Sequence, residues 1–287
     1  MSISKGWPAP AKINLFLQIN GRRGDGYHNL QTIFQFINVC DQIDFQIRDD
    51  GIIERDSDLA GVSSEDDLTV KAAKLLREHV QGSKGATITV HKRIPMGAGL
   101  GGGSSNAATV LVALNFLWGL NLPESDLVAL GLRLGADVPI FVRGKSAWAE
   151  GIGEKLSPFS PEVGPIFVII PNCEVPTREI FNDPLLTRDT DAIKMHEFSI
   201  ASSRNDCELV TRRLYPSVGD ALDWLGHYRP ARMSGTGSSV FAFFECREEL
   251  QVVKRSLPSD WIGFAAEREN YSPLLKKIDK ESKVLKG

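Results

Sequence analysis

The segment PMGAGLGGGSSNAA, residues Pro95 to Ala108, gives the first indication of the fold, because it places five glycines within seven positions. A loop with so few Cβ atoms lets backbone N–H groups come close to a bound anion. A strand is predicted before it at Ala86–His91, and a largely buried helix after it at Ser104–Trp118. Because a helix N-terminus offers unpaired N–H donors and about half a positive charge, this arrangement predicts a phosphate-binding site.

Other interpretations of the same glycines compete with this one. A flexible turn capped by its serines is the plainest, although five glycines would then cost backbone entropy without need. The G-x-G-x-x-G dinucleotide pattern is met by Gly97, Gly99 and Gly102. That pattern also requires a βαβ unit and an acidic residue about 20 positions later. Here the predicted helix leads to Asn121 and then to a second helix at Pro123–Leu134, so the context is missing.

Two kinase patterns are excluded more directly. A Walker A loop needs a lysine before its serine or threonine, and the run GGGSS has none. Protein kinases carry H-R-D and D-F-G motifs, which this chain lacks. The loop therefore predicts phosphate binding of another type.

The composition is that of an ordinary folded protein with a small-molecule partner. The 287 residues are 42% hydrophobic and 24% charged, and this length favours two domains of about 100 to 200 residues each. The net charge of −3 argues against nucleic acid as a partner, since a phosphate backbone is bound by an excess of Lys and Arg. The four cysteines and five histidines show no C-x-x-C or H-E-x-x-H spacing, so no metal site built by the protein alone is predicted.

The location of the protein is predicted from what the sequence lacks. No apolar run reaches the roughly 18 residues of a membrane span, and the N-terminal residues do not follow the pattern of a signal peptide. We therefore expect a cytoplasmic protein that does not enter a membrane and whose cysteines are reduced. The choice between monomer and dimer stays open.

The mixture of strand and helix patterns predicts two α+β domains. Strands are predicted at residues 12–19, within 31–47 with a break at 40–42, at 166–170 and at 239–244. Helices are predicted at residues 66–80, 123–134 and 247–256, and within 206–225 with an interruption at Pro216. The Gly- and Pro-rich stretch 151–165 indicates a junction. We place the boundary there, which gives an N-terminal domain of residues 1–155, which holds the phosphate-binding loop, and a C-terminal domain of residues 156–287.

Two charged residues of the N-terminal region are candidates for chemistry. Asp137 stands between Gly-Ala and Val-Pro, where an aspartate is usually a turn or N-cap residue. Lys12 lies inside the apolar strand KINLFLQI, so its ammonium group needs a partner or a solvent-facing side. The turn GRRGDGYHNL displays Tyr27 and His28 just after its glycines.

At this point the sequence resembles the GHMP kinase superfamily over nearly its whole length. The motifs that carry the resemblance are WPAPAKINLFLQI at residues 7–19, GDGYHNLQTIFQF at 24–36, PMGAGLGGGSSNAA at 95–108, GADVPIFVRG at 135–144 and SGTGSSVFAFF at 234–244. The resemblance implies a two-domain GHMP kinase fold: an N-terminal α/β domain like domain 2 of ribosomal protein S5, and a C-terminal ferredoxin-like domain. It also implies an active site in the cleft between the domains.

Within the superfamily, the motifs are most similar to those of a bacterial branch in the non-mevalonate pathway of isoprenoid precursor biosynthesis. The reaction that this implies moves the γ-phosphoryl group of ATP, accompanied by Mg²⁺, to the 2-hydroxyl of 4-(cytidine 5'-diphospho)-2-C-methyl-D-erythritol. A carboxylate near the hydroxyl would accept its proton or orient it, and a neighbouring cation would keep that carboxylate ionised. By resemblance, Asp137 is the catalytic aspartate and Lys12 the lysine beside it.

The resemblance assigns the binding residues one by one. The ATP site is expected to comprise Pro95, Met96, Gly97, Ala98, Gly99, Leu100, Gly101, Gly102, Gly103, Ser104 and Ser105, together with Lys92 and Leu68. On the substrate side, Tyr27 and Phe181 match the two aromatic walls that stack on the cytosine, and His28 the residue that reads the base edge. Asn14 resembles the residue near the sugar-alcohol end, and Thr177 belongs to the same segment as Phe181.

One position departs from the family pattern. Where the superfamily resemblance implies an asparagine before Leu68, this chain has Asp67, which puts hydrogen bonding to adenine through that side chain in question. Two rival functions are kept: another GHMP kinase, acting on homoserine, mevalonate or a sugar, and a nucleotide-binding module without catalysis. Dependence on cytidine distinguishes the first rival, and the presence of both Lys12 and Asp137 argues against the second.

Overall fold

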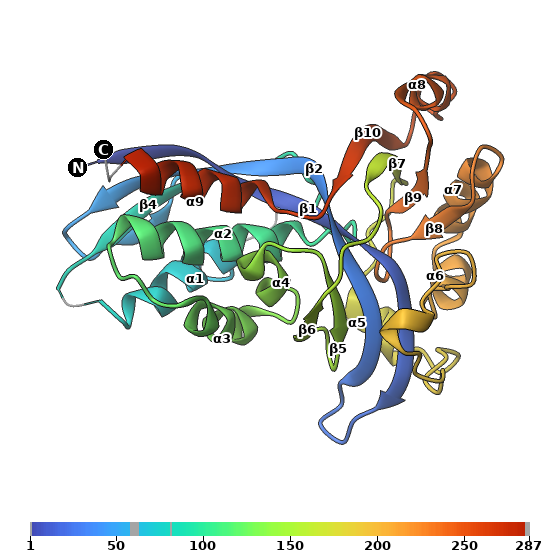
Figure 1. Ribbon diagram of the computed structural model, residues 1–287, viewed down its shortest axis with the longest axis horizontal. Helices are drawn as coiled ribbons and strands as arrows, with labels where there is room; N and C mark the ends of the chain where they lie inside the picture. Colours follow the sequence, from blue (N-terminus) through green and yellow to red (C-terminus); the bar gives the residue numbers. More distant parts are fainter. Residues whose placement is uncertain (1, 58–62, 81, 285–287) are drawn as a thin grey trace.

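A long antiparallel hairpin connects the two lobes of the protein (Figure 1). The structure is a computed structural model that describes residues 2–57, 63–80 and 82–284. Strand β1 (Ile3–Arg22) pairs with β2 (His28–Arg48) from one end to the other, with register shifts that mark bulges. Bulges bend and twist a strand pair, and this hairpin runs from the first lobe into the second.

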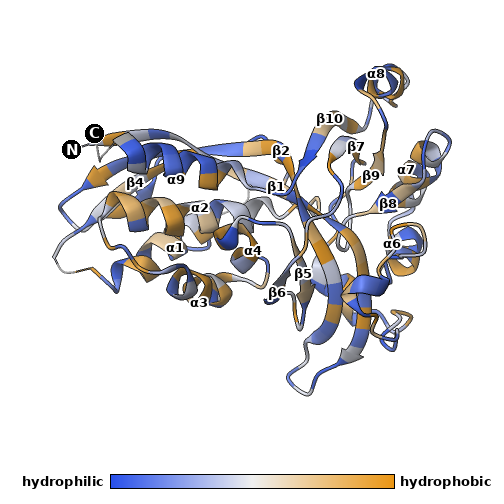
Figure 2. Ribbon diagram, in the orientation of Figure 1, coloured by the Kyte–Doolittle hydropathy of each residue, from blue (hydrophilic) through white to orange (hydrophobic). Residues whose placement is uncertain are grey.

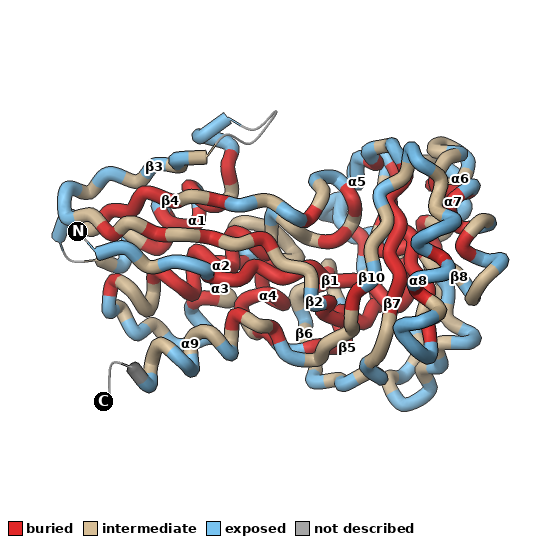
Figure 3. Tube along the Cα trace, turned by 90° about the horizontal axis from the view of Figure 1, so that it is seen from above, coloured by how far each residue is buried: buried red, intermediate tan, exposed pale blue. Residues whose placement is uncertain are grey.

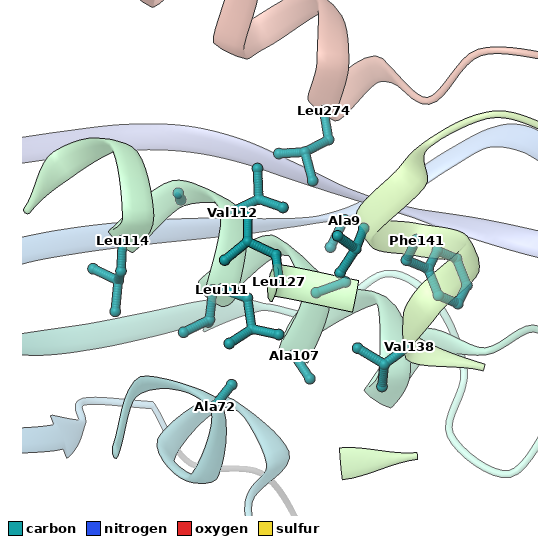
Figure 4. Packing of buried hydrophobic residues seen from close by; sticks show 14 of the residues in the cluster. Ala9, Ala72, Ala107, Leu111, Val112, Leu114, Leu127, Val138, Phe141 and Leu274 are labelled. Atoms are coloured by element: carbon teal, nitrogen blue, oxygen red, sulfur yellow. The ribbon is translucent and has the colours of Figure 1, made fainter. Parts of the chain in front are cut away.

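The first lobe packs helices against the inner part of this sheet. Its other strands are β3 (Ile53–Arg55), β4 (Gly85–His91), β5 (Ala147–Glu150) and β6 (Lys155–Pro158). Its helices are α1 (Leu68–Arg77), α2 (Gly102–Leu117), α3 (Glu124–Leu134), α4 (Val138–Arg143) and α9 (Pro273–Val284). Helix α2 is the centre of this core, because every residue from 105 to 114 is buried. Figure 4 shows its Leu111, Val112 and Leu114 among side chains of neighbouring elements.

The second lobe is a smaller sheet covered by helices. Its strands are β7 (Gly164–Ile170), β8 (Ala231–Met233), β9 (Val240–Phe243) and β10 (Ile262–Glu269), in the order β10-β7-β9-β8. Its helices are α5 (Thr177–Asn182), α6 (Glu208–Leu214), α7 (Pro216–Gly226) and α8 (Arg247–Arg255), with a 3₁₀ turn η1 (Met195–Glu197). In Figure 3, β7 is buried over most of its length, as its run of apolar residues predicts.

One sheet extends through both lobes. Strand β10 pairs with β2 at Arg268–Ile37 and Glu269–Phe36, so the strand order β3-β4-β2-β10-β7-β9-β8 is continuous. A separate cluster of buried side chains lies at the junction and combines Ile13 and Ile33 of the hairpin with Ile166 of β7. The lobes are therefore joined by strand pairing and by a shared apolar core.

Most predicted elements are confirmed, and one prediction is wrong. Helices predicted at residues 66–80, 104–118, 123–134 and 247–256 correspond to α1, α2, α3 and α8, and Pro216 separates α6 from α7 by starting the latter. The predicted break at residues 40–42 is absent, because β2 continues through them. Its polar residue Asp41 is fully buried with partners of its own rather than lying in a turn.

The C-terminal helix α9 returns to the first lobe. Helix α9 follows the second lobe in sequence but lies along β1 in the first (Figure 1), where Leu274 belongs to the first core. In Figure 2, α9 shows both polar and apolar colouring, as an amphipathic covering helix does.

The domain boundary at residue 155 stays a prediction. Across residues 2–57, 63–80 and 82–284, no helix combines the length and apolar character needed to cross a lipid bilayer.

Candidate active site

A cavity of about 1130 Å³ lies between the two lobes and is lined by both. The first lobe contributes the glycine-rich loop, the start of α1 and residues of the hairpin. The second contributes α5 and the turn at Gly235–Thr236. All of the binding and catalytic residues predicted from the sequence line this cavity except Ser105, which is fully buried behind it.

The backbone path of the glycine-rich loop requires glycine at two positions, Gly99 and Gly101. Gly99 and Gly101 have φ angles of 72° and 73°, in the left-handed region that disfavours a side chain. A Cβ on Gly99 would lie 2.6 Å from the Ser234 carbonyl oxygen and 2.7 Å from that of Gly237, both in the second lobe. A Cβ on Gly101 would lie 2.7 Å from the Phe141 ring. The loop is thus clamped between the lobes.

The first turn of α2 presents unpaired polar groups next to the cavity. The helix begins at Gly102, and its N-cap residue Gly101 makes no side-chain cap hydrogen bond, so the alternative of a serine-capped turn is wrong. Among the described residues, the buried Ser105 hydroxyl and Asn106 Oδ1 have no hydrogen-bond partner. The N–H donors of a helix N-terminus form an anion-binding surface, whereas Asn106 Oδ1 can only accept a hydrogen bond.

Lys12 and Asp137 meet at the wall of the cavity, beside the glycine-rich loop. Lys12 Nζ lies 3.2 Å from Asp137 Oδ2, donates to Asn14 Oδ1 at 2.6 Å, and lies 3.4 Å from the Gly99 carbonyl oxygen. The lysine side chain is 5% exposed, whereas the Asp137 side chain is 34% exposed. The lysine is therefore fixed within the protein, while its partner carboxylate is accessible from the cavity.

A hydrogen-bond chain holds the Lys12 environment in place. Asn14 Nδ2 donates to Thr32 Oγ1 at 2.9 Å, which turns its Oδ1 toward Lys12. The Asn14 backbone N–H donates to Ser234 Oγ at 3.1 Å, and that hydroxyl donates to the Gly99 carbonyl at 3.1 Å. One network thus links β1, β2, the glycine-rich loop and the second lobe.

Lys92 is held by a residue that sequence reasoning missed. The fully buried Asp41 carboxylate accepts from the backbone N–H groups of Arg93 at 2.7 Å and Ile94 at 2.8 Å, and from Lys92 Nζ. A Cβ on Gly102 would lie 3.2 Å from Lys92 Nζ, so the ammonium group is placed at the start of α2. A lone aspartate inside a strand pattern gave no signal except its misfit with the apolar alternation.

Asp67 stands where the family pattern implies an asparagine, and its side chain is bonded to other residues of the protein. It is the N-cap of α1, and its Oδ1 accepts from Thr69 N and Thr69 Oγ1, both at 2.7 Å. Its Oδ2 accepts from Arg55 Nη1 at 2.5 Å, and both side chains of this ion pair are less than a tenth exposed. The carboxylate is thus committed to capping and to Arg55.

The far end of the cavity is aromatic. Tyr27 is 59% exposed, whereas the rings of His28 and Phe181 pack with centroids 5.3 Å apart and planes 33° apart. Thr177, at the start of α5, shares a 3.2 Å hydrogen bond with Thr236 across the cavity wall. Burial, then the charge of Arg188, lowers the pKa of the His28 imidazole, which favours its neutral form.

Comparisons with known proteins agree with this geometry. The family model described as the GHMP kinases N terminal domain matches residues 67–145, and that of the GHMP kinases C terminal matches residues 186–263. The two-lobed fold with its clamped glycine loop is therefore that of a GHMP kinase, as the resemblance implied. A relative from Nitrosococcus oceani, named 4-diphosphocytidyl-2-C-methyl-D-erythritol kinase, is 50% identical over 96% of this chain and 98% of its own.

Solved structures support the same assignment. A crystal structure of 4-(cytidine 5'-diphospho)-2C-methyl-D-erythritol kinase superposes with a TM-score of 0.80 at 31% identity, over 93% of this chain and 99% of that chain. A crystal structure of mevalonate kinase superposes with a TM-score of 0.67 over 94% and 100%, but at 14% identity it shows a shared fold alone. The chain belongs to the 4-diphosphocytidyl-2-C-methyl-D-erythritol kinase family.

Proposed function

We propose that this protein transfers the γ-phosphoryl group of ATP to the 2-hydroxyl of 4-(cytidine 5'-diphospho)-2-C-methyl-D-erythritol. The observation that carries the proposal is the Lys12–Asp137 pair, 3.2 Å apart, in a cavity that is also lined by the glycine-rich loop and by the aromatic residues Tyr27 and Phe181. A kinase of this kind needs a nucleotide site and an acceptor site that meet at one polar centre.

The nucleotide end is suited to a triphosphate. Backbone N–H groups of the loop and of the first turn of α2 supply donors, and Lys92 supplies a positive charge beside them. Such donors are fixed before the reaction, so they stabilise developing charge without reorganising. Leu68 at the start of α1 lines the same end and is assigned to the adenine.

The acceptor end is suited to a flat base and a sugar alcohol. Tyr27 and Phe181 are assigned as the walls that stack on the cytosine, and His28 as the residue that hydrogen-bonds its edge. Asn14, next to Lys12, is assigned to the sugar-alcohol end, and Thr177 to the region between. Stacking combined with a few directed hydrogen bonds is the usual way to hold such a ligand.

The chemistry is a direct transfer without an enzyme-bound intermediate. As the 2-hydroxyl attacks phosphorus, Asp137 accepts its proton or orients it, because its carboxylate is the accessible partner of the pair. Lys12 offsets negative charge in the transition state. The network through Asn14 and Ser234 keeps the lysine in position.

The site also fits a magnesium ion brought in with the nucleotide. Within the described part of the chain, no three His, Cys, Asp or Glu side chains gather as a metal site would require. Magnesium in phosphoryl transfer needs only one or two protein oxygens, since phosphates and water supply the others. The Asp137 carboxylate, which lines the cavity, is the group that would hold it, and the ion would neutralise phosphate charge.

The test is a substrate panel with ATP and Mg²⁺. We expect phosphorylation of the cytidine-diphosphate compound and not of mevalonate, homoserine or a sugar. Turnover of one of those instead would favour another GHMP kinase activity, and ATP binding without any transfer would favour a binding module. We expect Asp137→Asn to lower kcat roughly a hundredfold or more, and wild-type turnover in the folded variant would contradict the catalytic assignment. Asp223→Asn is the control, because Asp223 pairs with Arg212 at 2.9 Å outside the cavity.

A further inference from the structure

Arg188 joins the base end of the cavity to the helix that carries one of its walls. Its Nε donates to His28 Nε2 at 3.1 Å, and its Nη2 donates to the carbonyl oxygens of Phe181 at 3.0 Å and Asp183 at 2.7 Å. Its Nη1 donates to the Leu186 carbonyl at 3.0 Å. Four hydrogen bonds thus fix one guanidinium group against both His28 and the C-terminal end of α5.

The contact with His28 determines where the imidazole carries its proton. A guanidinium group has N–H donors and no acceptor, so His28 Nε2 must accept with its lone pair. In the neutral ring, the single proton then resides on Nδ1. Among the described residues, no protein group forms a hydrogen bond with Nδ1, so this N–H is left for a ligand.

The charges around the imidazole act in the same direction. Among the described residues, no carboxylate forms an ion pair with Arg188, and the nearby Asp183 carboxylate pairs with Arg213 instead. Arg22, which pairs with His28 at the end of the hairpin, adds a second positive charge. Both charges oppose protonation of the ring, and a neutral ring is the one that can keep a lone pair toward Arg188.

We propose that Arg188 is a positioning residue that sets the base specificity of the site by holding His28 as an Nδ1–H donor. This rests on the proposed function, in which His28 meets the base edge. Cytosine has an acceptor at N3, which a donor satisfies, whereas uracil has an N–H at the same position, which a donor opposes. A site that leaves two donors facing each other discriminates strongly, because each loses its hydrogen bond to water without replacement.

The same guanidinium group couples recognition of the base edge to the stacking wall. Its bonds to the Phe181 and Asp183 carbonyls satisfy acceptors at the end of α5, the helix that carries Phe181. The ring that reads the edge and the ring that stacks on the base therefore take their positions from one residue. A purely structural role as a helix cap would affect every nucleotide substrate alike.

The first test measures the tautomer by nitrogen-15 NMR of the full-length protein. The chain has five histidines, and the His28 signals are assigned by their loss in His28→Asn. We expect the Nδ1–H tautomer in the wild type and a mixture of both tautomers in Arg188→Met. An Nε2–H tautomer in the wild type, or an unchanged Nδ1–H tautomer in Arg188→Met, would overturn the role of Arg188 whatever the enzyme phosphorylates.

The second test compares the cytidine- and uridine-diphosphate forms of the substrate. In Arg188→Met the competent tautomer is only part of the population, so we expect KM for the cytidine compound to rise roughly threefold to tenfold with little change in kcat. We expect the cytidine-over-uridine ratio of kcat/KM to fall by about tenfold. Arg188→Lys, which keeps a positively charged N–H donor, should restore part of the ratio.

The control is Arg213→Met, because Arg213 pairs with the Asp183 side chain next to α5 without contacting His28. It should leave the cytidine-over-uridine ratio unchanged. An equal rise of KM for both substrates in Arg188→Met, with the same ratio, would reduce Arg188 to a helix cap and refute the proposal. A wild-type enzyme without turnover of the cytidine compound would instead refute the proposed function.

Discussion

The two ends of the cavity are built by different means. At the nucleotide end the groups that face the ligand are mainly backbone N–H donors, presented by a loop whose glycines Gly99 and Gly101 have left-handed φ angles. At the base end they are side chains, Tyr27, His28 and Phe181. Backbone donors recognise phosphate, which every ATP-dependent kinase shares. Side chains distinguish one acceptor molecule from another.

Because the two ends are built differently, they should tolerate different substitutions. The loop depends on the absence of side chains, so adding a single methyl group should damage it. The base end depends on the presence of particular rings, so removing one should affect only the acceptor. Lys12 lies near the Gly99 carbonyl oxygen of the loop and donates to Asn14, which is assigned to the acceptor, so its loss should cost the most.

The largest expected effect is that of Lys12→Met, which removes the charge shared by the two ends while keeping a side chain of similar length. We expect kcat to fall roughly a hundredfold to a thousandfold, because a fixed donor to the transition state is lost. Steady-state turnover with ATP and the cytidine compound measures it. Lys84→Met is the control, since Lys84 pairs with Asp49 at 2.8 Å outside the cavity. A change of less than about threefold in Lys12→Met would show that the ends meet elsewhere.

Gly99→Ala tests the nucleotide end alone. The new Cβ would lie 2.6 Å from the Ser234 carbonyl oxygen, so the loop must leave its place, and we expect KM for ATP to rise roughly tenfold or more, together with a loss of about 1–3 kcal/mol of stability. Gly119→Ala introduces backbone strain without a steric clash, because Gly119 has a φ of 70° with nothing within 4 Å of its Cβ position. It should lower the melting temperature only slightly and leave KM unchanged. Equal effects of the two variants would mean that collision with the second lobe is unimportant.

Tyr27→Ala tests the base end alone. Stacking on a base contributes about 1–3 kcal/mol, so KM for the cytidine compound should rise by about fivefold to a hundredfold while KM for ATP stays the same. Tyr271→Ala is matched in exposure, at 57% against 59% for Tyr27, and lies outside the cavity. Should Tyr27→Ala raise both KM values together, the two ends would not be separate sites.

Asp67→Asn is expected to have the smallest effect on turnover. Both of its carboxylate oxygens are bonded to protein groups, so KM for ATP should change less than about threefold. The loss of charge beside the buried Arg55 should lower the free energy of unfolding by about 3 kcal/mol, which chemical denaturation measures. Asp49→Asn is the control, because the Asp49 side chain is 79% exposed and lies outside the cavity. A large rise in KM for ATP would give Asp67 a direct part in the nucleotide site.

The sequence predicted the nucleotide end better than the supports of the cavity. The strand, the glycine loop and the helix that form the nucleotide end follow one another directly in the sequence. The roles of Gly99 and Gly101 could therefore be predicted. Asp41 was missed, and its strand was wrongly broken, because its partners at Lys92 and Arg93 lie some fifty residues away. A polar residue in an apolar strand pattern suggests a turn when its hydrogen-bond partners are not known. Once the partners are known, the same residue is recognised as a buried residue that holds its neighbours in place.

The base end shows the same limit over a longer range. Tyr27 and His28 were found through a motif, but Arg188 lies 160 residues after His28 in a segment without a motif. Only the fold brings its guanidinium group to the imidazole. The ring contact of Phe181 with His28, rather than directly with Tyr27, likewise depends on how α5 meets the end of the hairpin.

The return of helix α9 to the first lobe sets a condition on synthesis of the protein. Ribosomes release a chain from its N-terminus onward, and domains often fold as soon as they emerge. Here Leu274 completes the first core, and Leu17 and Ile19 of β1 belong to the core of the second lobe. Neither core can therefore close while the chain is still short. The nascent protein must therefore expose apolar surface for most of its translation.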